Sequence, residues 1–402
     1  MSPHKDKKSL IVILSVFSLI IFGTYFITLL ARGYRPHISQ TGISLKSSGL
    51  LSATSKPKGA GVYLDDKLIT ATDDTINLPP DQYFLKIVKD GYFSWQKNIN
   101  IKKETVFQSD AQLFRSSPDL RPITQTGAIN PTVSPDYSRV IYSVASASAA
   151  ADNGLYLIEL ASSPLALTKN TPRQISPNYP SIDWSTATFT FSPDSRQVLA
   201  SFTTSGANYL LSLDSPINFS SLVDVTYKLP LIKDEWKIKE KDLIDAKIAQ
   251  LPLSIQPAVS TESTRHISIS TTDDKILYLS ASDSAIPDKI LSPPPAQSTQ
   301  PQARQVKSGN YYVYDVKDDT NFLVGPKSSV QNPFWLYGSN NIVYVENGSI
   351  IGIDYDATNK LTIFNGQVET NNVFPWADGT KIIVLTSAYS GSTQNLYAIT
   401  IR

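Results

Sequence analysis

The stretch of sequence that decides the fold runs from Val133 to Tyr142 and reads VSPDYSRVIY. An apolar residue leads into a polar turn, and the turn leads into β-branched and aromatic residues that favour a strand. The pattern returns as FSPDSRQVLA from Phe191 to Ala200 and as ISTTDDKILY from Ile269 to Tyr278. Two degenerate copies follow, from Trp335 to Tyr344 and from Pro375 to Val384. A phrase that recurs in this way indicates a repeat architecture.

Each copy is followed by a second alternating strand, so the repeating unit is a small sheet. These strands are Leu155 to Leu160, Tyr209 to Leu213, Tyr311 to Val316, Ile350 to Tyr355 and Leu396 to Ile401. The copies start 58, 78, 66 and 40 residues apart, and the shortest spacing matches the roughly 40 to 45 residues of a four-stranded propeller blade. Radial packing would cover the sheet faces, so we predict a β-propeller over residues 117–402. An array of β-sandwiches is the alternative.

Five repeats are recognisable, and the longer spacings need either insertions or a sixth, diverged blade, which the 78-residue interval favours. Residues 232–250 place apolar side chains near one helical stripe, which predicts an amphipathic helix that acts as a lid, a blade-edge element or an interface. Residues 282–305 are rich in Pro and Gln and are expected to form a disordered loop. A shorter insertion is expected over residues 145–152.

The Ser-Pro-Asp phrases at Ser134 to Asp136 and Ser192 to Asp194 resemble the repeat of TolB-like propellers, whose usual phrase is Trp-Ser-Pro-Asp-Gly. Tyr137 and Ser195 stand at the Gly position here, and only Asp378-Gly379 keeps the Asp-Gly pair. The resemblance implies a propeller that serves as a binding platform or, in other chains, as a gate for a fused peptidase. It implies no activity for this domain.

Ahead of the repeats, about six short alternating runs separated by turn residues predict a compact β-sandwich over residues 49–116. The runs are Leu50 to Ser55, Gly61 to Leu64, Thr75 to Leu78, Tyr83 to Val88, Asn98 to Ile101 and Thr105 to Leu113. Asp65-Asp66 supplies a tight hairpin turn, and Gly91 tolerates positive φ. Gly59, Gly61, Gly91 and Trp95 are expected to be structural.

This module resembles the PEGA domain family. The resemblance rests on SKPKGAGVYLD from Ser55 to Asp65, LPPD from Leu78 to Asp81, KDGY from Lys89 to Tyr92, and Trp95. Lys58 replaces the Glu of the Pro-Glu-Gly-Ala motif. The resemblance implies a small, non-catalytic extracytoplasmic module that acts in spacing or adhesion.

Leu10 to Ala31 contains 22 residues without a charge, enough to cross the roughly 30 Å hydrocarbon core as one helix. A cleaved signal peptide is the alternative, but this stretch is longer than the usual apolar region of a signal. Lysines before the helix and basic residues after it nearly balance, so the positive-inside rule leaves the orientation open. The low-charge composition favours a cytoplasmic tail over 1–9, a linker over 32–48, and an extracytoplasmic location for residues 32–402.

Composition excludes several classes of protein. Lys plus Arg number 36 against 35 for Asp plus Glu, so nothing favours a dedicated nucleic-acid binder. The absence of cysteine excludes disulfides, thiolate metal sites and cysteine nucleophiles.

Catalytic motifs are also missing: the chain holds only His4, His37 and His266, and no hydrolase elbow, HExxH helix or phosphate-binding loop occurs. Carboxylates crowd two segments. At Asp315 to Asp319 a solvated turn is expected, and at Asp354 to Asn359 a hairpin turn that closes a blade is favoured over a calcium loop, which would need a turn Gly and a distant Glu. Trp184, Trp335 and Trp376 are expected in the blade cores. We therefore assign no catalytic, cofactor-binding, metal-binding or ligand-binding residue.

These features predict a non-enzymatic, single-pass membrane protein that presents a PEGA module and a propeller outside the cell, as a binding or scaffold protein of the envelope. The expected partner is an envelope protein or a cell-wall polymer. The alternative is a hydrolase, or the regulatory subunit of one, that acts on envelope glycan or peptide. The sequence fixes neither the partner, nor the blade number, nor the oligomeric state.

Overall fold

The computed structural model describes residues 4–31, 34–39, 42–160, 171–213, 217–251, 253, 256–259, 264–272, 274–287, 298–366, 368–369, 372–387 and 391–402. The chain forms two compact units. The first comprises Met1–Lys89, Ser94–Ala111 and Pro294–Thr299, and the second comprises Asp90–Phe93, Gln112–Pro293 and Gln300–Arg402.

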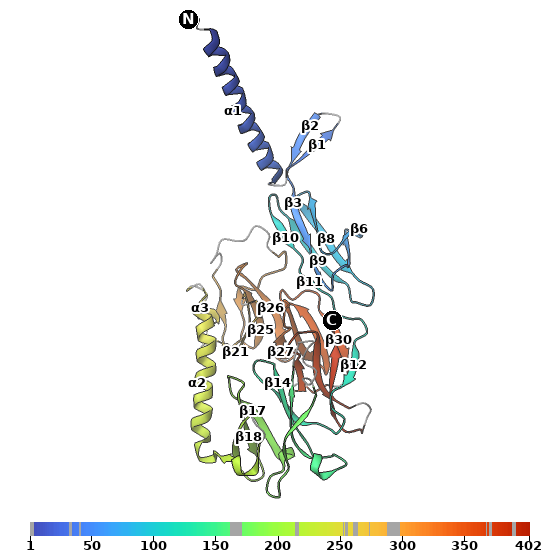
Figure 1. Ribbon diagram of the computed structural model, residues 1–402, viewed down its shortest axis with the longest axis vertical. Coiled ribbons are helices and arrows are strands. Elements are labelled where there is room, and N and C mark those ends of the chain that lie inside the picture. The colour runs from blue at the N-terminus through green and yellow to red at the C-terminus, as the bar shows by residue number, and fades with distance from the viewer. Residues whose placement is uncertain are drawn as a thin grey trace. The chain divides into compact units, whose positions relative to one another are not determined.

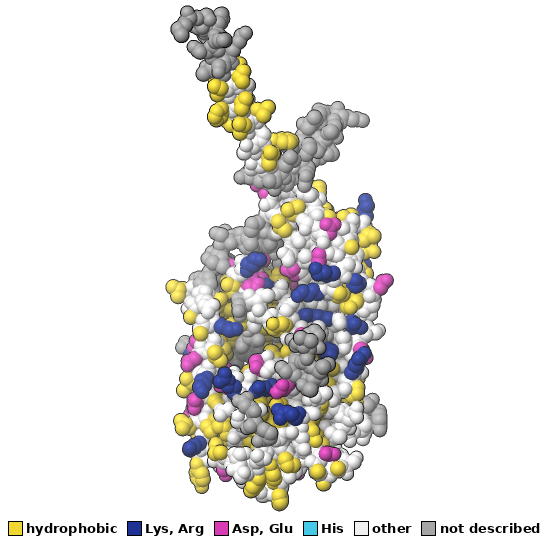
Figure 2. Space-filling model, in the orientation of Figure 1, with side chains coloured by type: hydrophobic (Ala, Val, Ile, Leu, Met, Phe, Trp, Pro, Cys, Tyr) yellow, Lys and Arg dark blue, Asp and Glu magenta, His cyan; other side chains and the backbone are white. Residues whose placement is uncertain are grey.

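The chain begins with helix α1, which spans His4–Ala31 (Figure 1). Within it, Ile11–Leu29 has a mean hydropathy of 2.3 and is not buried, so apolar side chains cover its surface (Figure 2). Its length and composition suit either a membrane anchor or a signal peptide. Strands β1 (Arg35–Ser39) and β2 (Gly42–Lys46) then form an antiparallel hairpin, where the sequence predicted only a linker.

The first unit also contains a small β-sandwich. One sheet has the order β10-β3-β7, the other β6-β5-β8-β9, and β11 pairs with β4. Their bounds are β3 Gly49–Ala53, β4 Ser55–Lys56, β5 Gly61–Leu64, β6 Lys67–Ala71, β7 Asp74–Leu78, β8 Asp81–Val88, β9 Trp95–Ile101, β10 Val106–Gln108 and β11 Ala111–Gln112. Alternate residues of β3 and β9 are buried, as expected of strands with one face on a core. Asp65 and Asp66 have positive φ in the predicted hairpin turn.

The second unit is a β-propeller, in which the described residues form five four-stranded antiparallel sheets. The first sheet in chain order contains β13 (Ile129–Val133), β14 (Arg139–Val144), β15 (Gly154–Glu159) and β16 (Arg173–Pro177). The second contains β17 (Ala187–Phe191), β18 (Gln197–Phe202), β19 (Asn208–Ser212) and β20 (Val223–Asp224). The third sheet contains β21 (Thr264–Ile269), β22 (Lys275–Ser280), β25 (Asn310–Asp315) and β26 (Thr320–Pro326). The fourth contains β27 (Gln331–Trp335), β28 (Asn341–Glu346), β29 (Ser349–Asp354) and β30 (Leu361–Asn365). The last has the order β12-β33-β32-β31, from β12 (Asp119–Pro122), β31 (Val373–Pro375), β32 (Lys381–Thr386) and β33 (Asn395–Thr400). Each copy of the phrase joins two neighbouring antiparallel strands of one sheet, so the five predicted repeats are confirmed.

Apolar clusters hold successive sheets face to face, which makes this a propeller. Ile141 and Leu157 of the β13–β16 sheet share a cluster with Phe189 and Val198 of the β17–β20 sheet. The opposite face of the β13–β16 sheet packs on the β31–β33 sheet. That sheet packs in turn on β27–β30, and β27–β30 packs on β21–β26. Four such sheet–sheet joints therefore connect the five blades in a row.

Helix α2 (Leu229–Ile248) occupies the interval in which a sixth blade was expected. Its Trp236 is buried with Leu199 and Val225 on the β17–β20 sheet. At its other end, Ile248 is buried with Ile276 and other residues of the β21–β26 sheet. Figure 1 shows α2 running along the propeller edge from β17 and β18 to β21. Among the described residues, a helix thus replaces the sixth blade, because it covers the two sheet faces that have no neighbouring sheet.

The expectation of a disordered loop over 282–305 is wrong at both ends of that segment. Strands β23 (Ser284–Ala285) and β24 (Gln305–Val306) pair antiparallel. Ile286 and Val306 are buried against the β21–β26 sheet beside α2 and the short helix α3 (Gln256–Val259). The centre of the segment, 288–297, lies outside the described residues.

Candidate functional site

The Ser-Pro-Asp phrases form hydrogen-bonded turns. The Ser134 hydroxyl donates to Asp136 Oδ1 at 2.6 Å and accepts the Arg139 N–H at 2.9 Å. Ser192 makes the same pair of bonds to Asp194 and Gln197. Because both serine hydroxyls are fully engaged in closing a hairpin, the phrases are structural.

The third copy of the phrase brings a lysine into the blade interior. Lys275 is 4% exposed, and its Nζ lies 2.8 Å from Asp274 Oδ2 and 3.4 Å from Asp315 Oδ2. The Tyr355 ring, from the neighbouring sheet, packs against the ammonium at 4.7 Å from its centroid. Asp315 Oδ1 also accepts the backbone N–H of Asp318 at 3.1 Å. This lysine cluster joins two blades at the β25–β26 turn.

Burial and like charge raise the pKa values of two acids in and beside the lysine cluster, Asp315 and Asp318. Burial raises the pKa of Asp315, although Lys275 opposes the shift. The pKa of Asp318 rises to about 6, chiefly because of burial and then because of the nearby Asp315 carboxylate. Burial alone would lower the pKa of Lys275, but Asp315 and Asp274 outweigh it and raise the pKa. Lys275 therefore stays charged, while Asp318 gains or loses a proton at about pH 6.

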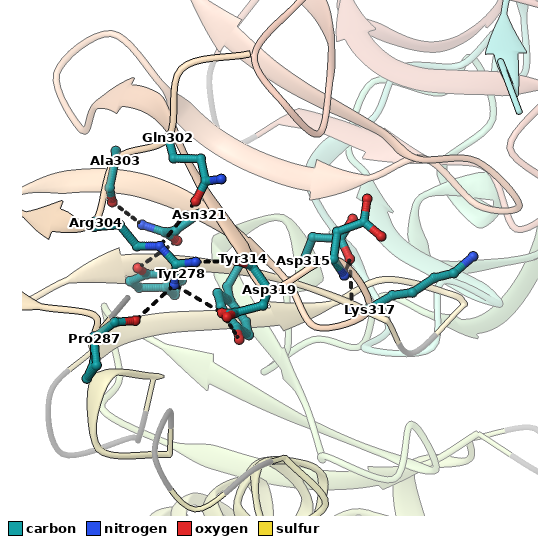
Figure 3. A network of polar contacts seen from close by, with 11 residues as sticks. Tyr278, Pro287, Gln302, Ala303, Arg304, Tyr314, Asp315, Lys317, Asp319 and Asn321 are labelled. Carbon is teal, nitrogen blue, oxygen red and sulfur yellow. Dashed lines mark hydrogen bonds and ion pairs between the residues drawn. The ribbon is translucent and has the colours of Figure 1, made fainter. Parts of the chain in front are cut away.

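A second polar network, centred on Arg304, ties β24 to the same blade (Figure 3). Arg304 Nη1 lies 3.0 Å from Asp319 Oδ1, and the guanidinium also donates to the Asp319 carbonyl oxygen. Asp319 Oδ1 accepts the Tyr314 hydroxyl at 3.0 Å. Beside this group, Asn321 accepts the Tyr278 hydroxyl at 3.0 Å and donates to the Ala303 carbonyl oxygen at 2.7 Å. The network anchors the C-terminal end of the 282–305 segment.

These two networks correct the sequence analysis, which placed Asp315 and Asp319 in solvated turns. The structure buries both, at 2% and 4% exposure. Their cationic partners, Lys275 and Arg304, lie 40 and 15 residues away in the chain, so no local pattern pairs them. The expected hairpin turn at Asp354 does form, and that carboxylate accepts the Asn341 amide at 2.6 Å.

The other candidate residues lie in structural positions or outside the description. Trp184 and Trp335 donate from Nε1 to the carbonyl oxygens of Pro177 and Ser268, each at 3.0 Å, and Trp376 is 4% exposed. All three lie in the sheet–sheet clusters, as predicted. The side chains of His4, His37 and His266 lie outside the described residues. Within the described part of the chain, no three His, Asp or Glu residues gather as a metal site.

Sequence reasoning missed two asparagines that link neighbouring blades. Asn130 and Asn332 each precede a proline and have φ of 50° and 47°, a conformation that Asn adopts more readily than most residues. Asn130 Nδ2 donates to the Ala187 carbonyl oxygen of the next sheet at 2.8 Å, and Asn332 does the same to Val373 at 3.2 Å. The Asn-Pro pair that occurs at both positions is the sequence signal that could have identified these links.

Helix α2 has a long exposed middle. Seven consecutive residues, Lys237–Leu243, are exposed, which is almost two turns of helix with solvent on every side. Its apolar contacts with the sheets lie toward its two ends. The single apolar stripe predicted from the sequence is in fact two stripes: Ile232 and Trp236 pack on the β17–β20 sheet, and Ile244 and Ile248 pack on the β21–β26 sheet. Leu243 belongs to neither and is 58% exposed.

Comparison with known proteins identifies the small module. Residues 48–117 match the PEGA domain family model, so the predicted PEGA domain is confirmed. No curated protein matches the chain.

Similar solved structures include TolB from Acinetobacter baumannii, with 12% identity, a TM-score of 0.23, and coverage of 80% of this chain and 60% of that one. A putative TolB from Agrobacterium tumefaciens has 12% identity, a TM-score of 0.22, and coverage of 89% and 99%. The Pyrococcus horikoshii acylaminoacyl peptidase has 11% identity, a TM-score of 0.21, and coverage of 69% and 39%. The chain thus spans about two fifths of that peptidase. At these scores, the propeller assignment rests on strand order and sheet packing.

Proposed function

We propose that this protein is a non-catalytic binding or scaffold protein of the cell envelope, held in the membrane by α1. The observation that carries the proposal is the combination, in one chain, of an apolar helix of membrane-spanning length, a PEGA domain and a propeller. Propellers present variable loops on a rigid scaffold, which suits recognition. The partner is an envelope protein or a cell-wall polymer. A net charge of +1 gives no support to a nucleic-acid partner.

The polar clusters also favour binding over catalysis. Lys275 and Arg304 are each held by buried carboxylates, and the phrase serines are held by their own turns. A catalytic arrangement would instead direct a nucleophile and a base toward a substrate. The runner-up, a hydrolase or its regulatory subunit, draws no comparable support from the described residues.

The proposed topology has residues 1–9 in the cytoplasm and residues 32–402 outside. Because the chain has no cysteine, one cysteine at the exposed Thr204 of the β18–β19 turn reports on its side of the membrane. We expect a membrane-impermeant maleimide to label Thr204→Cys in intact cells and to label Ser2→Cys only after lysis. The reverse pattern contradicts the topology.

The binding function is tested with the purified full chain in detergent, on isolated cell-wall sacculi and on envelope extracts. We expect retention of a partner by the full chain and no retention by a chain truncated after residue 117. Equal retention by the truncated chain would assign binding to the PEGA domain. Turnover of glycan or peptide substrates that His266→Ala abolishes would place the protein among enzymes.

A further inference from the structure

Exposed apolar side chains gather on one segment of the propeller. Of the ten large apolar side chains exposed in the second unit, among the described residues, seven lie between Phe219 and Leu253. They are Phe219, Val223, Tyr227, Leu231, Ile238, Leu243 and Leu253. Tyr227 is fully exposed and Leu231 is 69% exposed. Scattered exposed apolar residues need no explanation, but a concentration on one segment is typical of an interaction surface.

The outward side of α2 combines these apolar residues with acids. At about 100° per residue, Leu231, Ile238 and Asp242 lie within about 20° of one line, and Asp234 and Glu235 flank it. All of these residues are exposed. In contrast, every lysine of α2 projects at least about 80° away from that line. The helix therefore presents an acidic and apolar stripe on one side, and its lysines project from the other sides. At the edge of the stripe, Lys239 reaches Glu235 and pairs with it at 2.8 Å.

We propose that this stripe, Leu231 to Asp242 of α2, binds a basic amphipathic segment of a partner protein. Apolar residues of the partner would cover Leu231 and Ile238, and flanking Lys or Arg would face Asp234 and Asp242. The inference rests on the proposed binding function and specifies the chemistry of the partner. The charges of the segment favour this partner over two other occupants, a lipid surface and a second copy of the chain.

A lipid surface fits the segment poorly. Residues 219–253 contain six lysines and six acids, so the segment has no net positive charge to attract anionic headgroups. A second copy of the chain fits poorly as well, because pairing of two α2 helices through these stripes would set acids against acids. Figure 2 shows acidic, basic and apolar side chains interspersed on the edge where Figure 1 places α2.

The test uses the full chain in detergent and a labelled synthetic peptide of about 18 residues, built from Leu and Lys as an amphipathic helix. We expect the peptide to bind, and its version with Glu in place of Lys to fail. The double variants Leu231→Ser/Ile238→Ser and Asp234→Lys/Asp242→Lys should each weaken binding about tenfold or more. The matched controls are Leu120→Ser/Leu323→Ser, exposed apolar residues elsewhere, and Asp152→Lys; these should leave the affinity unchanged.

Several outcomes overturn the inference. Equal binding of the Glu peptide, or equal affinity in the α2 variants, removes the stripe as the site. Vesicles of anionic lipid that bind through Leu231 and Ile238 would assign the surface to the membrane. A dimer seen in sedimentation and lost in Leu231→Ser/Ile238→Ser would assign it to a second copy. If the peptide fails while the propeller still retains an envelope partner, this inference fails and the proposed function stands.

Discussion

In the middle of the row of blades, strand β12 completes the β31–β33 sheet. At the two ends of the row, helix α2 instead spans from the β17–β20 sheet to the β21–β26 sheet. The strand closes its sheet with a backbone ladder, in which Leu120 pairs with Ile399. Helix α2 instead contacts its two sheets through side chains alone, at two small apolar patches. A sheet–sheet joint is therefore a continuous cluster, while the α2 joint is a bridge with an exposed middle. This difference predicts unequal stability and unequal tolerance of mutation.

The largest expected effect lies in a sheet–sheet joint. Trp184 is 0% exposed and contacts two blades, so Trp184→Ala removes a large core side chain and leaves a cavity. We expect a loss of about 4 kcal/mol in the free energy of unfolding, measured by urea denaturation. Trp184→Phe keeps most of the volume and should lose clearly less. A loss below about 1 kcal/mol for Trp184→Ala would contradict the joint's role.

The sequence predicted the blades but not their closure, for a physical reason. The repeated phrase is local, because a turn and its flanking strand share ten residues, so the hairpins could be read directly. The β12–β33 ladder joins Asp119–Pro122 to residues near the C-terminus, and nothing in the sequence DLRP marks that pairing. The PEGA domain could also be predicted from the sequence, because its motifs are short, local turns that follow one another along the chain. The helix over residues 232–250 was also predicted, and α2 spans Leu229–Ile248. That this helix stands in place of a sixth blade, and that the ion pairs are buried, needed the three-dimensional structure.

The asparagine links offer a smaller perturbation of the same joints. Asn130→Ala removes the hydrogen bond to Ala187 and places Ala at φ 50°, which it adopts poorly. We expect a loss of about 2 kcal/mol in urea unfolding. Asn130→Gly keeps the conformation accessible and should lose about half as much. Equal losses in the two variants would show that backbone conformation has no part in the effect.

A mutation in the α2 joint should lower the stability of the helix alone and not that of the whole propeller. Trp236 is 9% exposed, and only Leu199 and Val225 are buried with it. Since the helix can detach while the blades stay folded, we expect Trp236→Ala to cost only about 1–2 kcal/mol of local stability. Hydrogen exchange should speed up across residues 229–248 and stay unchanged in β14 and β32. Leu231→Ala on the exposed side of α2 is the control. Loss of protection throughout the propeller would show that α2 is as integral as a blade.

The smallest expected effect lies at Asp318, on the blade that receives the far end of α2. Its pKa is raised to about 6 in the folded protein, above the ordinary value of 3.8, so the folded state holds the proton more tightly than the unfolded chain does. Stability from this group is therefore present at pH 4 and is lost as the pH rises through about 6. Because Asp318 is only half-buried, solvent screening limits the effect at pH 7.5 to about 1 kcal/mol. Asp318→Asn should remove that cost, so the variant should be more stable than the wild type at pH 7.5 and equal to it at pH 4. Asp152→Asn, at an exposed turn, is the matched control and should change neither value. A stabilisation by Asp318→Asn that is the same at both pH values would mean that charge repulsion from Asp315 and burial of the carboxylate are not its cause.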